Sequence, residues 1–440
     1  MSTFQYPQES KGRTLTRKCK TDGQITLLDL PVEIVFDIIA WLRSGKHGCR
    51  KSRPHSIIQS FKSLRLTSRS LAGFLAPVLL DAVDISCSAT AQDFLTWCRA
   101  CAAQNREPPV RRLAIRNVGH PSLDNNNLQL IPYEIFEDIL SVISPSLHQL
   151  KIAFDDCFEF SDKTAHSFRR ANKLWALHLH INSQPLDSGI SSPDSIFNDT
   201  GNMQLHNPCS FLASLKALPN LRELNLNSCL DYCTPFDTNG QFTSLPRVQH
   251  LCIRINSHST SLPSEPHNFL LELCRALSDN LLILEITGSR YDSSKLLPAL
   301  AVTRHRLEAL YLCEASVVQT LREWRFPRLR TFLLDDSRYL AREEFISPFF
   351  DQIMTLALRR WDGTDVPLDI PVQTLPSLKR VILTHTTQHS HDTISLHNAC
   401  RDTGIDLFAS AKSVNLQEIW AVDKLEARIQ EISSTQRGHL

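Results

Sequence analysis

Two groups of residues in the sequence have types and spacing that suit metal binding. The first is a C-x-x-C pair, Cys98 and Cys101, in the stretch FLTWCRACAA. The second is a set of three histidines and one aspartate in a polar stretch near the C-terminus: His385, His389, His391 and Asp392. Structural zinc needs four ligands, and the C-x-x-C pair has no second pair to complete a site. We therefore interpret the cysteines as core thiols and the histidines as part of a solvated loop, and we expect no cofactor and no metal.

Motifs for nucleotide binding, metalloprotease chemistry and serine hydrolysis do not occur in the sequence. The strings G-x-x-x-x-G-K-[ST], G-x-G-x-x-G, H-E-x-x-H and G-x-S-x-G are all missing. We therefore expect that the chain is not an enzyme. The alternative is a hydrolase or transferase hidden in a loop insertion, which turnover by the purified chain would reveal.

The composition describes a globular chain without a strong net charge. Of 440 residues, 42% are hydrophobic and 21% are charged, and 47 Lys and Arg balance 46 Asp and Glu. A net charge of +1 supplies no field for holding a phosphate backbone, so no nucleic-acid partner is expected. No stretch has the apolar length of a signal peptide or a membrane span, so we expect an intracellular protein with no membrane partner.

The cysteines and the basic stretches bear on where the protein works. Thirteen cysteines are scattered along the chain, which suits reduced and mostly buried thiols. The basic stretches KGRTLTRKCK and RSGKHGCRKSR are typical either of a nuclear localisation signal or of a flexible solvated segment. The expected location is therefore the cytoplasm, the nucleus or both.

A short apolar pattern, L-x-x-L-x-L, recurs after residue 108. Its middle positions are Leu113, Leu150, Leu177, Leu224, Leu251, Leu284, Leu310, Phe332, Leu356 and Val381. The later intervals match the roughly 20–29 residues of a leucine-rich repeat, and the longer early intervals require insertions. Helix-like stretches such as YEIFEDILSVIS and NFLLELCRALSDNL lie between the strings. Each repeat is therefore predicted to be a strand, a turn and a helix.

These repeats predict an α/β fold class with a parallel sheet on one face and helices on the other. A strand–helix unit cannot bury its apolar face alone, so the core of such a solenoid comes from stacking about ten repeats. We expect the irregular solenoid to cover residues 108–412, with an insertion near 184–208. The amphipathic segment 413–440 is expected to form a helix and tail that cap the array.

An earlier apolar region precedes the repeats and has helical periodicity. In ITLLDLPVEIVFDIIAWL, Ile34, Val35, Ile38 and Trp41 fall on one helical stripe, and Pro31 suits a helix start. A second segment, IIQSFKSLRLTSRSLAGFLAPVLLDAV, follows a long basic loop. We expect a tail over residues 1–24, a helical domain over 25–85 and a linking helix over 86–107.

The helical domain resembles an F-box, on the strength of LLDLPVEIVFDIIAWL and SLRLTSRSLAGFLAPVLL. With the repeats it is similar to the F-box proteins that act as non-catalytic substrate receptors of Skp–cullin–F-box ubiquitin ligases. The resemblance implies contact with a Skp-type adaptor, and through it with cullin, at Leu30, Pro31, Glu33, Ile34, Ile38, Leu66 and Leu71. Two alternatives remain open: an ordinary N-terminal capping helix, and an interaction scaffold that acts outside ubiquitin ligation.

The residues between the buried strand positions are candidates for binding a target protein. They point to the opposite face of the sheet, and they mix both charge signs with amides and one aromatic ring. The candidate target-binding residues are His178, His180, Asn225, Asn227, Arg254, Tyr311, Asp335 and Arg359. The alternative is a face that is only solvated.

The insertion contains a further short motif, from Asp187 to Ser192. Its sequence DSGISS resembles the D-S-G-x-x-S phosphodegron, so Ser188 and Ser192 are candidate phosphorylation sites. The alternative is an accidental match in a polar loop.

Overall fold

The computed structural model divides the chain into two compact units, Met1–Leu79 and Leu80–Leu440. It describes residues 80–119, 130–155, 160–181, 214–227, 245, 247–256, 266–289, 293–336, 340–359, 370–384, 391–410 and 415–437. The seven predicted adaptor-binding residues, Ser188, Ser192 and the insertion near 184–208 lie outside these residues.

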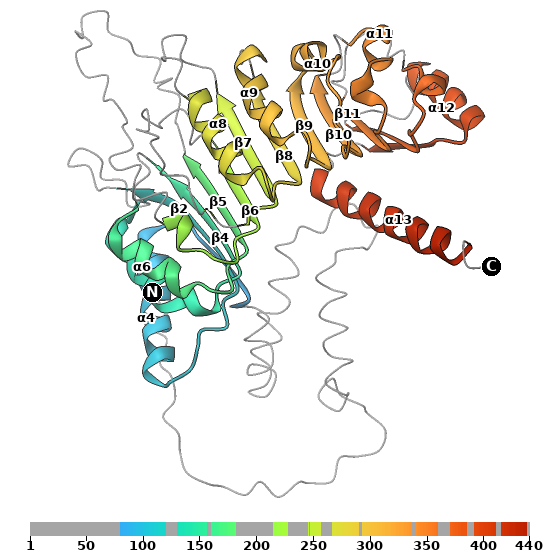
Figure 1. Ribbon diagram of the computed structural model, residues 1–440. Helices are drawn as coiled ribbons and strands as arrows, with labels where there is room; N and C mark the ends of the chain where they lie inside the picture. Colours follow the sequence, from blue (N-terminus) through green and yellow to red (C-terminus); the bar gives the residue numbers. More distant parts are fainter. Residues whose placement is uncertain are drawn as a thin grey trace, which may run out of the picture. The chain divides into compact units, whose positions relative to one another are not determined.

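The described residues of the second unit form one sheet of thirteen strands in which neighbours run parallel (Figure 1). Each main strand pairs with the next along the chain, and a short strand, β3, pairs beside β2. The strands are β1 Ala82–Ile85, β2 Arg112–Gly119, β3 Ile131–Pro132, β4 Gln149–Phe154, β5 Ala176–Ile181, β6 Glu223–Asn227, β7 His250–Asn256, β8 Ile283–Ser289, β9 Ala309–Glu314, β10 Thr331–Asp336, β11 Thr355–Arg359, β12 Arg380–Thr384 and β13 Asp406–Ser410.

Helices alternate with these strands, as the repeats predict. They are α4 Ser88–Ala103, α5 Tyr133–Ile143, α6 Asp162–Arg170, α8 Pro266–Leu277, α9 Ser293–Thr303, α10 Ala315–Leu321, α11 Arg342–Phe345, α12 His391–Thr403 and α13 Leu416–Arg437. Short 3-10 turns at Ser144–Ser146, Pro348–Phe350 and Val372–Thr374 replace or extend helices in some repeats. In Figure 1, α13 lies below the strands, away from the row formed by α8 to α12.

The register of the sheet confirms the predicted α/β repeat fold. All ten middle positions of the apolar pattern pair in one row, from Leu113 beside Leu150 to Leu356 beside Val381. These side chains are almost completely buried in a single large cluster with the helices. Burial of such a continuous apolar row is the main stabilising contribution in a leucine-rich-repeat solenoid.

The repeat array begins at β1, before residue 86. The predicted end of the N-terminal helical domain at residue 85 is therefore wrong. Ala82–Ile85 form β1 and pair in parallel with β2, and Arg112 makes a 2.7 Å ion pair with Asp81. Leu80, Val83 and Ile85 in fact match the L-x-x-L-x-L spacing. Helix α4 is consequently the helix of the first repeat rather than a linker.

A further strand, β13, extends the array beyond the tenth predicted string. Its Leu407 pairs in register with Val381. The apolar pattern misses this strand because Gly404, with φ +72°, stands where the other repeats have their first apolar residue. The glycine adopts a left-handed conformation that most residues avoid, and this conformation ends α12 and starts the strand.

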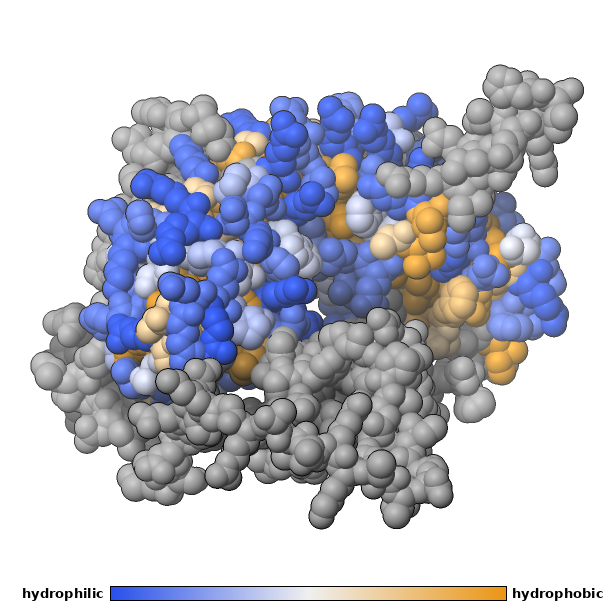
Figure 2. All heavy atoms as spheres, turned by 90° about the horizontal axis from the view of Figure 1, so that it is seen from below, coloured by the Kyte–Doolittle hydropathy of each residue, from blue (hydrophilic) through white to orange (hydrophobic). Residues whose placement is uncertain are grey.

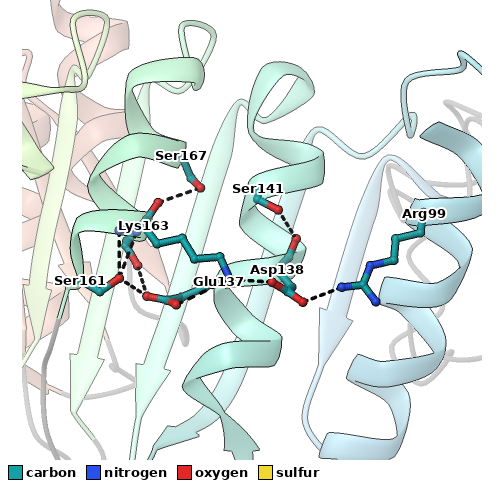
Figure 3. Close-up of polar contacts among 8 residues, drawn as sticks. Arg99, Glu137, Asp138, Ser141, Ser161, Lys163 and Ser167 are labelled. Atoms are coloured by element: carbon teal, nitrogen blue, oxygen red, sulfur yellow. Dashed lines mark hydrogen bonds and ion pairs between the residues drawn. The ribbon is translucent and has the colours of Figure 1, made fainter. Parts of the chain in front are cut away.

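Polar contacts hold helices α4, α5 and α6 side by side on the outer layer (Figure 3). Asp138 of α5 accepts from Arg99 of α4 and from Lys163 of α6, both at 2.6 Å. Ser161 caps α6 through the backbone N–H groups of Lys163 and Thr164. The ion pairs are partly exposed, so each contributes at most about 1 kcal/mol. Their effect is to align helices that the core already holds.

Candidate protein-binding site

The face of the sheet opposite α4 to α12 carries the predicted target-binding residues, and we call it the inner face. Parallel register places the middle row of this face in the order His178, Asn225, Cys252, Glu285 and Tyr311 across β5 to β9. A second row, two residues further along each strand, contains His180, Asn227, Arg254, Asp335 and Arg359. The eight candidates therefore share one face, and their role in target binding stays a prediction.

Two histidine–glutamate pairs span neighbouring strands of the inner face. His178 Nε2 lies 2.8 Å from Glu223 Oε1, and His250 Nε2 lies 2.9 Å from Glu285 Oε1. Burial alone would raise the pKa of Glu223, but the hydrogen bond and charge of His178 lower it overall. These carboxylates are already occupied by neighbours, so they act as fixed acceptors within the face.

Next to these pairs lies a cluster of hydrogen-bond donors around Asp335. The Cys313 thiol contacts Asp335 Oδ2 at 3.6 Å, and Arg359 Nη1 donates to the same oxygen at 3.2 Å. Burial raises the pKa of Cys313 to about 12 and that of Tyr311 well above its usual range, with Asp335 acting in the same direction. Both groups are protonated near neutral pH, so they serve as hydrogen-bond donors rather than nucleophiles.

Helix α13 covers part of the inner face over the later strands, so this part of the face is neither simply solvated nor open to a target. Its Leu416 and Ile419 pack on an apolar patch formed by inner-face residues of β8 to β12: Ile283, Ala309, Leu333, Ala357 and Ile382. Polar side chains at these positions would leave the helix without an apolar contact. The helix predicted to cap the array thus lies across its face.

A polar anchor holds α13 on this patch. Asp423 is 1% exposed and accepts from Thr331 at 2.5 Å, and from Thr355 and Arg380 at 2.8 Å each. Arg380 also donates to Glu426 at 2.6 Å. Burial raises the pKa of Asp423, while the two hydroxyls and Arg380 act in the opposite direction. The anchor is specific because each donor comes from a different strand.

The first turns of α13 form one wall of a groove of about 640 Å³ on the inner side of β4 to β8. Trp175, Arg222 and His250 line it from the sheet, and Gln417 and Trp420 line it from the helix. Sequence reasoning missed this groove because its two walls come from segments far apart in the chain. The local signal for the groove is Trp175, a half-buried tryptophan immediately before β5.

The metal-binding interpretations have different outcomes. Cys98 is buried in α4, and burial raises its pKa to about 12, so it is a core thiol as predicted, whereas Cys101 is only half-buried. His385 and His389 lie outside the described residues. Within the described parts of the chain, no group of three or more metal-ligating side chains comes together.

None of the helices among the described residues has the length and apolar composition needed to cross a membrane.

The hydropathy of the surface differs between the two ends of the repeat array. Figure 2, seen from below, shows hydrophilic residues dominating the side of the first repeats, while hydrophobic residues gather toward the C-terminal repeats. Phe408 of β13 and Leu425 of α13 are among the exposed apolar residues at that end.

Comparison with known proteins gives little similarity in sequence. No family model matches the chain, and no curated protein matches it. Among solved structures it is similar to one described as the crystal structure of the Rad7 and Elc1 complex in yeast. That match has 15% sequence identity and a TM-score of 0.27, and it covers 78% of this chain and 95% of the other. At these values the likeness assigns this chain neither a partner nor an activity.

Proposed function

We propose that this protein is a non-catalytic substrate receptor of a Skp–cullin–F-box type of ubiquitin ligase. In this proposal the N-terminal helical domain binds a Skp-type adaptor and, through it, cullin, while the repeats hold a target protein. The proposal rests on a parallel repeat array with a polar inner face, which in the sequence follows the segment LLDLPVEIVFDIIAWL.

The inner face suits recognition of a protein through distributed contacts. Between β5 and β9 it presents histidines, amides, thiols, a tyrosine and carboxylates whose partners lie on neighbouring strands. Protein interfaces combine aromatic and polar groups in this way, whereas a polyanion-binding face would need an excess of cations. Rigid strands fix these groups in place, so binding loses little conformational entropy.

The contribution of such a receptor to ubiquitin transfer is positioning. Holding a target close to the transferring subunits raises its effective concentration without any bond being made or broken on this chain. The protonated thiols and the tyrosine of the inner face agree with a role in which no nucleophile is required.

Capture of the adaptor by the full-length chain tests the proposal. We expect Leu30→Asp together with Ile34→Asp to abolish co-purification with a Skp-type adaptor and cullin, because two charges are forced into an apolar contact. The matched control is Ile346→Asp with Ile394→Asp, at two exposed apolar positions in the repeats, which should leave capture unchanged. Circular dichroism checks that both variants keep the repeat fold.

Two results would contradict the proposal. Capture that is undiminished in the folded Leu30→Asp and Ile34→Asp variant would reject this docking surface. Failure of the unaltered, folded chain to bind the adaptor would instead favour an interaction scaffold that acts outside ubiquitin ligation.

A further inference from the structure

The groove beside α13 has an uncompensated positive charge. Its charged lining residues are Lys173, Arg222 and Glu223, apart from its histidines. Glu223 is engaged by His178, whereas neither Lys173 nor Arg222 has an acidic partner among the described residues. Both cations are exposed at the groove, so they are available to a ligand.

The two cations come from adjacent loops, which brings them to the same end of the groove. The backbone N–H of Arg222 donates to the Trp175 carbonyl at 2.8 Å. The Asn220 amide donates to the Asn172 carbonyl at 2.5 Å. These bonds hold the loop before β6 against the loop before β5, and Trp175 lines the groove beside them.

The start of helix α13 adds to the positive potential of the groove. His148 does not, because burial and the charges of Arg111 and Lys173 lower its pKa and favour the neutral imidazole. Helix α13 begins at the groove, where Asn415 caps it by accepting from the Gln417 backbone N–H at 2.8 Å. The N-terminus of a long helix carries a partial positive charge, so it reinforces the field of the two cations.

Aromatic rings and amides complete the lining. Trp420 is oriented by a 3.0 Å hydrogen bond from its Nε1 to Glu308, and Trp175 faces the same space. Gln249 and Gln417 present amides, which match the N–H and C=O groups of an extended peptide. A volume of about 640 Å³ accommodates a few side chains of such a segment.

We propose that this groove binds an acidic peptide segment of the target, with an anionic group between Lys173 and Arg222 and an apolar side chain against the two tryptophans. The inference deepens the proposed function, since it names the chemistry of the target at the inner face. The anionic group is a carboxylate or a phosphate, which share the same charge and acceptor geometry.

Fluorescence anisotropy with labelled synthetic peptides tests this inference on the full-length chain. The probe is a short peptide of glutamates flanking one phenylalanine. Its comparison peptides replace the glutamates with glutamine, with lysine or with phosphoserine. We expect binding of the glutamate peptide, no measurable binding of the glutamine and lysine peptides, and weakening of the anionic peptides as salt rises.

Substitutions then assign the binding to the groove. Lys173→Gln with Arg222→Gln should weaken the glutamate peptide by about tenfold or more, because two charge-assisted contacts are lost. The control, Arg328→Gln with Arg330→Gln, removes the same charge from a second cationic pocket before β10, and should leave affinity unchanged. All four side chains are exposed, so folding is expected to survive in both variants.

The outcomes separate this inference from the proposed function. Tighter binding of the phosphoserine peptide identifies phosphate as the anion, and equal or weaker binding identifies carboxylate; both support the groove. Equal loss in the two variants, or equal affinity for the glutamate and glutamine peptides, overturns it. Adaptor capture is measured separately, so a negative result in the peptide-binding experiment does not contradict the proposed receptor function.

Discussion

Gly288 occupies a position in β8 that admits only glycine. Its φ is +117°, and a Cβ atom placed there would lie 1.8 Å from the carbonyl oxygen of Ile255. Gly288→Ala must therefore move one of the two strands, and we expect a loss of at least about 2 kcal/mol in the free energy of unfolding. Denaturant unfolding followed by circular dichroism measures the loss.

The matched control for this prediction is Gly404→Ala. Gly404 also has a positive φ, but no atom lies within 4 Å of its added Cβ. Its substitution should cost only about 1 kcal/mol, from backbone strain alone. Equal losses for the two variants would show that the contact with Ile255 relaxes without cost.

Cys87 is expected to be more reactive than the thiols buried in the helices. Its Sγ lies 3.1 Å from the Thr90 hydroxyl, and hydrogen bonds from Thr90 lower its pKa, whereas burial raises the pKa of Cys98 to about 12. More thiolate is present at Cys87 near neutral pH, so iodoacetamide should modify it before Cys98 and the other cysteines among the described residues. Peptide mass spectrometry during alkylation checks the order.

A substitution at Thr90 separates the hydrogen bond from simple exposure. Thr90→Val removes the hydroxyl at nearly constant shape, so the pKa of Cys87 should rise and its alkylation near neutral pH should slow. Cys101, half-buried and with a raised pKa, serves as the internal reference. An unchanged rate at Cys87 would mean that accessibility alone controls it.

At the scale of elements, the attachment of α13 to the sheet depends on the buried carboxylate of Asp423. Asp423→Ala would leave the Thr331 and Thr355 hydroxyls and part of Arg380 without their acceptor. A buried donor that loses its partner costs about 1–3 kcal/mol, so the helix should detach from the sheet for a larger fraction of the time. Hydrogen exchange of the α13 amides should accelerate while that of β4 to β7 stays the same.

Glu418→Ala is the control for the helix itself. Glu418 is an exposed residue of the same helix, and its removal leaves the contact with the sheet intact. Exchange in α13 should then stay close to that of the unaltered chain. If both variants behave alike, the apolar patch holds the helix without help from Asp423.

At the scale of the whole molecule, the start of the repeat array lies at β1. A chain beginning at Leu80 keeps Ala82–Ile85 beside β2, whereas a chain beginning at Ser86 loses the strand and the fully buried Ile85. The shorter chain should be less stable by at least about 2 kcal/mol, judged by its denaturant midpoint. Equal midpoints would place β1 outside the cooperative unit.

The apolar spacing alone determined the repeat architecture. Each string from Leu113 to Val381 became a strand in register, because a period-two apolar row between turns is satisfied only by stacking on its neighbours. The same local pattern at Leu80, Val83 and Ile85 was readable as a helix, since a three-residue interval also suits helical periodicity. Strand pairing with β2 decided between the two.

Only the tertiary structure decided where α13 lies and hence where the groove forms. The segment is amphipathic, so it was predicted to be a helix, but an apolar stripe does not specify which apolar surface it covers. The choice rests on contacts such as Trp420 with Glu308 and Asp423 with Thr331, between residues about a hundred positions apart. Such contacts leave no local period in a sequence, whereas repeats do, because their partners recur at a constant interval.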